Sequence, residues 1–307
     1  MAESDTITKN AKSNLAFALV NLPEEERVHM AQFYAFCRLV DDIVDEPGMT
    51  PEQRHAALDR WVAIVTRTAE PEPGVEAEVR TLIDDLSLDT APMLELISGC
   101  RSDINPVQPA NRKEFLAYCY KVASCVGLTS ATVMGAGPAA RDYAVALGYA
   151  LQIVNILRDV AEDCAEHGRL YLPADDMEIF GVTRDDIRNQ RYDYRLRQLL
   201  AYEAALAEKY FAEADDLYQA LGAEDKNALI PAQAMSLIYH TILEKMQDDE
   251  YRVFERRYRV GNFRKLWFLL RARLGTMEMP SMPNVPSLSE WSFLRNKDKD
   301  SDSRDKE

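Results

Sequence analysis

Residue types that commonly carry metal, redox or nucleophilic chemistry are scarce in this sequence. Its 307 residues include only four histidines and five cysteines. The cysteines are odd in number and form no Cys-x-x-Cys pair, which argues against a disulfide framework and a zinc site. The histidines show no metal-ligand spacing either. We therefore expect a reduced, cytoplasmic protein with buried thiols at Cys37, Cys100, Cys119, Cys125 and Cys164.

Long apolar runs and strand patterns are also missing. No stretch approaches the ~18 consecutive apolar residues of a membrane span, and residues 1–10 are too polar for a signal peptide. Glycine contributes only 12 residues, and no strand-like alternation of convincing length occurs. Helical periodicity instead runs through most of the chain before residue 278. The sequence predicts an all-α protein.

The charge distribution indicates which partners the protein can bind and where its folded domain ends. A net charge of −15 argues against a nucleic-acid partner. Residues 251–275 depart from this balance, with seven arginines and one lysine against a single glutamate. Residues 279–307 are first rich in Pro and Ser and then almost entirely charged, so we expect a disordered tail there. We expect a flexible N-terminus over residues 1–11 and one folded domain over residues 12–278.

Proline, glycine and acidic residues mark where the expected helices begin and end. Pro23-Glu-Glu-Glu26, for example, combines proline with acidic residues in a first turn. The segment Gly168-Arg-Leu-Tyr-Leu-Pro173 reads as a loop. The expected helices cover roughly residues 23–45, 51–70, 75–86, 91–103, 111–127, 139–166, 190–221, 225–249 and 262–274.

Two aspartate-rich segments each end an apolar run. Asp41 and Asp45 would lie one turn apart on one helix face, and so would Asp159 and Asp163. Like charges at this spacing repel each other, so a helix alone gains nothing from them. A hard cation resolves the conflict, because Mg²⁺ binds one or two carboxylates together with substrate phosphates. The pattern therefore predicts a site for Mg²⁺, or Mn²⁺ in its place, and a diphosphate.

Chance must be weighed against this interpretation. A chain with 51 acidic residues contains such pairs at random, and Asp85 and Asp89 form one beside a predicted helix start. The two segments above differ because their carboxylates continue apolar, helix-periodic stretches, where an unpaired charge is costly. Each also has an arginine shortly upstream, Arg38 and Arg158. The matched context favours a functional site.

These motifs resemble the squalene/phytoene synthase family, the head-to-head trans-isoprenyl diphosphate synthases, in its bacterial form. The resemblance covers roughly residues 12–275. Its most specific parts are Tyr34-Ala-Phe-Cys-Arg-Leu-Val-Asp-Asp-Ile-Val-Asp45, Tyr118-Cys-Tyr-Lys-Val-Ala with Val126-Gly127, and Leu151-Gln-Ile-Val-Asn-Ile-Leu-Arg-Asp-Val-Ala-Glu-Asp163 followed by the 168–173 loop. It implies an isoprenoid-synthase-type bundle around a central cavity, with residues 12–278 as the catalytic domain.

The resemblance also implies roles for individual residues. The metal ligands would be Asp41, Asp45, Asn155, Asp159 and Asp163. Tyr34, Tyr118 and Tyr239 would face the reacting carbons. Arg38, Arg158 and Arg256 would contact diphosphate oxygens, Gln152 would line the site, and Val122, Val126, Leu147 and Leu151 would wall the prenyl tail. One departure is Ser124-Cys125, which replaces a pair that usually contains glycine and can alter the cavity shape.

The expected reaction joins two prenyl diphosphates with loss of diphosphate. One substrate ionises and alkylates the 2,3 double bond of the other to give a cyclopropylcarbinyl diphosphate, which a second ionisation can rearrange. Cations and arginines neutralise the departing charge, and a dry aromatic cavity protects the carbocation. We favour two farnesyl diphosphates giving presqualene diphosphate and a squalene-type C30 product. The alternative is a phytoene synthase that uses two geranylgeranyl diphosphates.

Other interpretations remain open. A head-to-tail synthase or a terpene cyclase would also pair acidic motifs with Mg²⁺. A non-catalytic helical docking protein would be expected to lose the four aspartates, which are all present. The need for NADPH is undecided, because Gly135-Ala-Gly137 is only a weak dinucleotide motif. The basic amphipathic segment 263–271 predicts core packing first, with peripheral contact to the inner membrane face during product release as the alternative.

Overall fold

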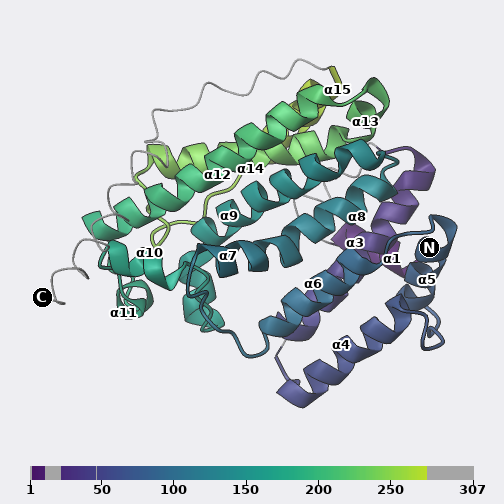
Figure 1. The fold of residues 1–307 in the computed structure, drawn as a ribbon, viewed down its shortest axis with the longest axis horizontal. Helices are drawn as coiled ribbons and strands as arrows, with labels where there is room; N and C mark the ends of the chain where they lie inside the picture. Colours follow the sequence, from purple (N-terminus) through teal and green to yellow (C-terminus); the bar gives the residue numbers. More distant parts are fainter. Residues whose placement is uncertain (1, 11–21, 46, 275–307) are drawn as a thin grey trace, which may run out of the picture.

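The computed structural model describes residues 2–10, 22–45 and 47–274. Every regular element in these ranges is a helix, which confirms the all-α prediction (Figure 1). The α-helices are α1 (Glu3–Asn10), α3 (Glu24–Asp45), α4 (Pro51–Val65), α5 (Val75–Asp85), α6 (Ala91–Ser102), α7 (Arg112–Cys119), α8 (Cys125–Val133), α9 (Arg141–Glu166), α10 (Ala174–Ile179), α11 (Arg184–Arg188), α12 (Tyr194–Ala220), α13 (Ala223–Ala228), α14 (Ile230–Asp248) and α15 (Asn262–Leu274). A π-helical turn, η2 (Tyr120–Ser124), joins α7 to α8, and a 3-10 turn, η3 (Pro138–Ala140), precedes α9.

Local sequence signals fix several helix starts. At α4, Thr50 Oγ1 accepts the Gln53 N–H at 3.3 Å, and Gln53 Oε1 accepts the Thr50 N–H at 2.8 Å. These reciprocal bonds form a capping box, with Pro51 as the first helical residue. At α12, the Asp193 carboxylate caps two backbone N–H groups. Such caps satisfy donors that would otherwise lack partners, so they set where each helix begins.

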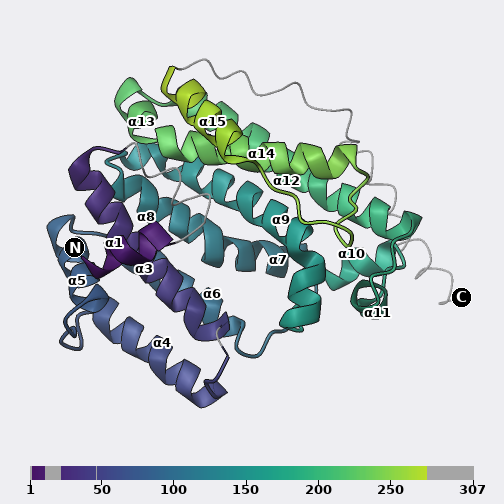
Figure 2. The same cartoon turned by 180° about the vertical axis from the view of Figure 1, so that it is seen from behind.

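Helix α9 forms the centre of the molecule. It packs against α12 most extensively, and against η2, α8 and α14 on its other sides. Figures 1 and 2 show it running along α12 and α14 and past α7 and α8. Within the described residues, Pro138–Glu166 is the one helical stretch long and apolar enough to cross a membrane by length and composition. Its central position explains that apolar character, because 56% of the apolar window is buried inside the protein.

The π-helical turn η2 interrupts what the sequence predicts as one helix over 111–127. Glycines let its neighbours approach closely: a Cβ on Gly148 of α9 would lie 2.5 Å from Ser124 Cα, and a Cβ on Gly99 of α6 would lie 2.7 Å from Val122 Cγ1. Ser124 is fully buried, and its hydroxyl donates to the Val145 carbonyl at 2.9 Å. The serine noted as a departure therefore seals the contact between η2 and α9.

The N-terminal segment differs from the prediction of a flexible stretch over residues 1–11. Glu3–Asn10 form helix α1, which lies against α3 and α5. The Glu78 carboxylate accepts the N–H groups of Glu3 and Ser4 at 3.0 and 3.2 Å, and thereby caps the helix from another element. A cap supplied 75 residues away leaves no local sequence signal. The expected tail over 279–307 lies outside the described residues.

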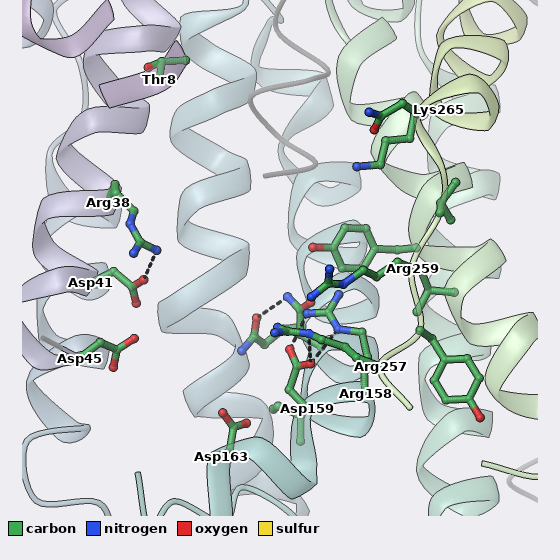
Figure 3. A pocket seen from close by; sticks show the side chains of 18 of the residues that line it. Thr8, Arg38, Asp41, Asp45, Arg158, Asp159, Asp163, Arg257, Arg259 and Lys265 are labelled. Carbon is green, nitrogen blue, oxygen red and sulfur yellow. Dashed lines mark hydrogen bonds and ion pairs between the residues drawn. The ribbon is translucent and has the colours of Figure 1, made fainter. Parts of the chain in front are cut away.

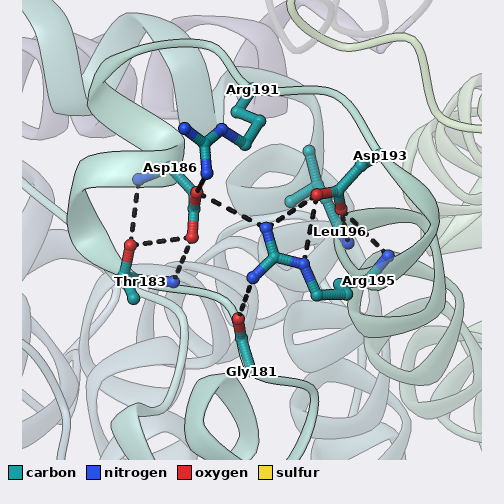
Figure 4. Close-up of polar contacts among 7 residues, drawn as sticks. All are labelled: Gly181, Thr183, Asp186, Arg191, Asp193, Arg195 and Leu196. Carbon is teal, nitrogen blue, oxygen red and sulfur yellow. Dashed lines mark hydrogen bonds and ion pairs between the residues drawn. The ribbon is translucent and has the colours of Figure 1, made fainter.

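Two short helices, α10 and α11, follow the 168–173 loop and were not predicted. Arg112 joins α7 to this region, with Nη2 at 2.7 Å from Asp176 Oδ2 and 3.0 Å from Glu203 Oε1 of α12. Both carboxylates are fully buried. Charge networks around Asp186 and Asp193 then fasten α11 to the start of α12 (Figure 4). Long-range charge pairing thus holds Asp176 of α10, whereas a local capping box formed by Thr183 and Asp186 starts α11.

Candidate active site

A cavity of about 1540 Å³ lies between α3 and α9. Its other walls come from α1, α14, α15 and the segment between the last two helices. Figure 3 shows two sets of charged side chains pointing into it from opposite sides, one from α3 and one from α9. The polar residues on these walls include Arg38, Asp41, Asp45, Gln152, Asn155, Arg158, Asp159 and Asp163. The structure thus brings both aspartate-rich segments to one cavity.

The α3 wall presents Arg38, Asp41 and Asp45 at intervals of three and four residues. Arg38 bridges two acidic side chains, with Nη1 at 3.4 Å from Asp41 Oδ2 and Nη2 at 2.6 Å from Asp42 Oδ1. About half of the Arg38 and Asp41 side-chain surface is exposed. Such pairs contribute only about 0–1 kcal/mol to stability, so they can be exchanged for other partners at small cost.

The α9 wall carries a tighter charge cluster. Arg158 Nε donates to Asp159 Oδ1 at 2.9 Å, and a second nitrogen of the same guanidinium reaches the other carboxylate oxygen. Arg257, from the segment after α14, lies 3.1 Å from Asp159 (Figure 3). It also donates to Glu162 at 3.0 Å. Because Asp159 and Arg158 are only 14% and 12% exposed, this pairing is largely desolvated. Asp159 is therefore neutralised by two arginines.

The negative charges of Asp163 and Asp41 are not neutralised by arginines to the same extent as that of Asp159. Burial, followed by the charge of Asp159, raises the pKa of Asp163 to about 7. Burial, followed by the charge of Asp45, raises the pKa of Asp41 to about 6, although Arg38 opposes the shift. Burial and a neighbouring carboxylate both disfavour the ionised form of each group, and the nearby arginines do not offset this penalty. A bound cation would relieve this penalty.

The donor set fits a divalent cation that also takes oxygens from a substrate. Asn155 Oδ1 is buried at the cavity and has no hydrogen-bond partner in the part of the chain that the structure describes, while its amide nitrogen donates to Gln152 Oε1 at 3.4 Å. An orphaned acceptor beside aspartates suits a hard cation. Across residues 2–10, 22–45 and 47–274, no three acidic, histidine or cysteine side chains converge on one point. The protein therefore forms an open site whose coordination phosphate oxygens would complete.

Asp103, another residue that lines the cavity, binds two tyrosine hydroxyls. Its Oδ2 accepts the Tyr118 hydroxyl at 3.0 Å, and its Oδ1 accepts the Tyr171 hydroxyl at 2.9 Å. The two rings stack with their centroids 4.6 Å apart. Burial, and then the nearby negative charge, raise the pKa of both hydroxyls, which keeps them as donors. Arg169 then joins this group to α3 through Asp45 Oδ1 at 2.6 Å and the Asp103 carbonyl at 3.3 Å.

Sequence reasoning missed Asp103 and gave no role to Arg169 or Tyr171. Arg169 and Tyr171 belong to the Gly168–Pro173 stretch, so that motif was the available signal. Asp103 is a single aspartate that follows α6, and nothing in its sequence context marks it. All three line the cavity.

Arg256 requires a correction. Its side chain is 57% exposed, pairs with Asp249 at 3.2 Å and is not among the described cavity residues. The neighbouring Arg257 lines the cavity and reaches Asp159. This segment is not helical, and Glu250 and Tyr251 have φ values of 53° and 59°. Helical periodicity therefore could not select which of two adjacent arginines faces inward.

The predicted aromatic and apolar residues divide into two groups. Tyr118 and Tyr239 line the cavity. Tyr34 is only 8% exposed and belongs to the hydrophobic core. Four further residues, expected to wall a prenyl tail, also lie away from the described cavity lining, in or beside the packed contact between η2, α8 and α9. They are Val122, Val126, Leu147 and Leu151.

An all-α bundle with two opposed acidic faces and arginines around one cavity defines a helical enzyme that acts on diphosphate esters. Comparison with known proteins gives the particular family. The squalene/phytoene synthase family model matches residues 8–264, and the chain belongs to this family. It is a prenyltransferase that joins prenyl diphosphates head to head.

Several relatives share about a third of their residues with this chain. Phytoene synthase of Arthrospira platensis is 33% identical over 270 residues, covering 82% of this chain and 85% of its own. 15-cis-phytoene synthase of Synechocystis is 34% identical, covering 81% and 77%. Phytoene synthase 3 of Zea mays is 33% identical and covers 84% of this chain, which spans 61% of the maize protein.

Solved structures agree on the fold. A dehydrosqualene synthase superposes with a TM-score of 0.76 at 28% identity, covering 89% of this chain and 94% of its own. The squalene synthase HpnC from Alicyclobacillus acidocaldarius gives a TM-score of 0.72 at 27% identity, covering 81% and 93%. These values confirm the predicted isoprenoid-synthase-type bundle.

Proposed function

We propose that this protein condenses two molecules of geranylgeranyl diphosphate head to head into a phytoene-type C40 product, with Mg²⁺ as cofactor. The observation that carries the proposal is the pair of acidic and arginine-bearing walls facing each other across one cavity. Relatives at 33–34% identity bear the name phytoene synthase, which supports the C40 alternative over the C30 product favoured from sequence alone. The C30 reaction is the second candidate, because a dehydrosqualene synthase has a similar fold.

Mg²⁺ would be held by Asp41 and Asp45 on one wall and by Asn155, Asp159 and Asp163 on the other. When bound, it would act as a Lewis acid on the diphosphate oxygens. Mn²⁺, which also prefers oxygen ligands, would substitute. The raised pKa values of Asp41 and Asp163 support this assignment, since both carboxyls gain from a cation.

Arginines on both walls would bind the diphosphates themselves. Arg38 and Arg158 belong to the two helices, and Arg257 reaches in from the segment after α14. A guanidinium binds phosphate oxygens through two parallel N–H donors, which lysine cannot reproduce. As the C–O bond of the first substrate breaks, these donors would stabilise the charge that develops on the leaving diphosphate.

The electron pair of the 2,3 double bond of the second substrate would then attack the carbon that has lost diphosphate, and loss of one proton would close the cyclopropane ring. A carbocation at this stage needs aromatic faces and little water. Tyr118 and Tyr171, stacked and held by Asp103, and Tyr239 on α14 would provide those faces. The cyclopropylcarbinyl diphosphate would then lose the second diphosphate, rearrange and lose a final proton. This route to a C40 hydrocarbon requires no reductant, so NADPH is not included in the proposal.

Incubation with Mg²⁺ and either farnesyl or geranylgeranyl diphosphate, with and without NADPH, tests the assignment. Chromatography with mass detection should find a C40 hydrocarbon from geranylgeranyl diphosphate and no dependence on NADPH. A C30 hydrocarbon as the sole product would replace the substrate assignment and leave the head-to-head reaction in place. Products joined head to tail, or cyclic products from a single substrate, would contradict the reaction itself. Asp45→Asn is the inactive control.

We further propose a cytoplasmic location with peripheral contact to a membrane, since a C40 hydrocarbon has negligible solubility in water. Fractionation of cells into soluble, salt-extractable and integral membrane material would test this placement. Recovery only in an integral membrane fraction would contradict it.

A further inference from the structure

Helix α15 has two apolar faces, and only one of them is buried. Phe268, Leu269 and Ala272 are each 5% exposed on the inner side, where α15 packs along α14. The outer side carries Phe263 at 95%, Leu266 at 59%, Trp267 at 56% and Leu270 at 47% exposure. The spacing i, i+3, i+4, i+7 places these four on one stripe. Figures 1 and 2 show α15 at the edge of the molecule.

Arginines border this stripe on both sides. At 100° per residue, Arg264 and Arg271 lie along one edge of the exposed face and Arg273 lies along the other. They belong to the basic segment 251–275 of a chain whose net charge is −15. A negatively charged surface would repel most of this protein, so attraction to one is concentrated around α15.

The apolar face continues into a neighbouring groove. A pocket of about 250 Å³ is lined by Leu266 and Leu270 of α15, by Leu22 and Pro23 before α3, and by residues at the start of α14. Its walls are mainly apolar. An aliphatic chain that meets the outer face of α15 therefore also finds a recess beside it.

We propose that this face of α15 docks on the surface of an anionic lipid bilayer. Trp, Phe and Leu on one stripe with arginines at its edges is the arrangement by which helices lie in the membrane interface. The arginine stems would lie along the acyl boundary while the guanidinium groups reach the headgroups. Two copies paired through this face would instead bring two sets of three arginines together, and their repulsion disfavours a second copy of this chain as the partner.

Docking would place the membrane beside the candidate active site. Lys265 and Asn262, on the same helix as the exposed stripe, line the main cavity, and Figure 3 shows Lys265 directed into it. One helix thickness thus separates the cavity from the bilayer. An apolar product would therefore have only a short distance to travel from the cavity into the lipid. This consequence for release depends on the proposed reaction, whereas lipid binding by α15 does not.

Sedimentation with sucrose-loaded vesicles tests the docking on the full chain. The wild-type protein should bind vesicles that contain phosphatidylglycerol and bind pure phosphatidylcholine vesicles weakly. Each arginine near an anionic surface contributes about fivefold to partitioning, so Arg264→Gln/Arg271→Gln/Arg273→Gln should lower it about a hundredfold. Trp267→Glu/Leu270→Glu should lower it at least about tenfold. The matched controls Val107→Glu and Arg188→Gln change exposed residues elsewhere and should bind normally.

Two further readouts identify the contacting face. In a Trp291→Phe background, where Trp61 is buried, brominated lipids should quench the tryptophan fluorescence; adding Trp267→Phe should leave binding normal but remove that quenching. Trp267→Glu/Leu270→Glu should keep normal turnover without vesicles, because neither side chain lines the main cavity.

Four results would overturn the proposal. Equal binding by the wild type and both multiple variants would show that another surface is responsible. Equal binding to neutral and anionic vesicles would show that the arginines do not attract the protein to anionic lipid. A wild-type dimer that Trp267→Glu/Leu270→Glu converts to a monomer, with no vesicle binding, would assign the face to a second copy. Binding seen only after removal of residues 275–307 would assign it to that segment.

Discussion

Replacing Asp163 by asparagine should stabilise the fold while abolishing most of its activity. Burial and the charge of Asp159 raise the Asp163 pKa from 3.8 to about 7, so ionising it costs the folded state free energy. The full shift corresponds to about 4 kcal/mol at ~1.4 kcal/mol per unit. Screening by solvent in the open cavity reduces this to about 2 kcal/mol. Asparagine nearly keeps the shape of the side chain and removes that cost.

The sign of the pH dependence follows from linkage. The folded-state pKa is raised, so the protonated form is favoured and no penalty exists below about pH 4, the unfolded pKa. The penalty grows between about pH 4 and pH 7 and then stays constant. Asp163→Asn should therefore match the wild type near pH 4 and exceed it near pH 8. With an unfolding entropy of ~2.1 cal/mol/K per residue over 307 residues, the gain corresponds to about 3 °C in Tm.

Asp159→Asn is the matched control, one turn away on the same helix. Asp159 is paired with Arg158 and Arg257, so its removal leaves a largely buried guanidinium without its carboxylate. This variant should lose about 1–3 kcal/mol of stability. Both variants should lose roughly 10²–10⁴ in kcat, because each removes a charged group at the site. Thermal melts between about pH 4 and pH 8, with product assays, measure both effects. An Asp163→Asn protein that melts at or below the wild-type temperature near pH 8 would refute the reasoning.

Three further predictions concern other charged groups. Arg257→Lys should lower kcat/KM by about 10–100-fold because a bidentate contact to the diphosphate is lost. The exposed Arg256→Lys should change kcat/KM less than about twofold, and equal effects of the two variants would contradict the placement of Arg257, rather than Arg256, at the cavity. Arg112→Leu should lower the unfolding free energy by about 3–5 kcal/mol, measured in urea, since two fully buried carboxylates lose a cation; a loss below about 1 kcal/mol would refute it. Asp103→Leu, which releases two tyrosine hydroxyls, should lower kcat about tenfold or more with little change in KM. Asp103→Asn should retain more of the wild-type kcat than Asp103→Leu. A change confined to KM would contradict the role of Asp103 in positioning the two tyrosines.

The sequence was most informative where one helix carries a whole pattern. Asp41 and Asp45 share a face because they are four residues apart in α3, and the same holds for Asp159 and Asp163 in α9. Helix type and spacing settle this without tertiary information. The facing of the two walls across one cavity is a property of the bundle, and here the family resemblance supplied what local patterning could not.

The sequence was least informative where contacts join distant segments. Arg169 reaches Asp45 across 124 residues, and the Asp103 carboxylate collects hydroxyls from two other elements. No spacing rule connects such positions. The Glu78 cap on α1 could not be predicted for the same reason. Asp89 shows that spacing alone can mislead. It lies four residues after Asp85, but it is an exposed residue whose carboxylate accepts the Ala91 N–H at 3.0 Å.

The ion pairs in the cavity bear directly on how a charged substrate would enter. Asp159 is bound by arginines, Asp45 by Arg169, and Asp41 by a half-exposed Arg38. If a metal–diphosphate complex enters as proposed, each carboxylate can exchange a guanidinium for a metal ion, and each freed guanidinium can take a phosphate oxygen. None of these three paired carboxylates is left without a cation during the exchange, which avoids the cost of burying an isolated ion. Arg158 would therefore neutralise the buried Asp159 before substrate binds, and Arg38 and Arg158 would both bind the substrate afterwards.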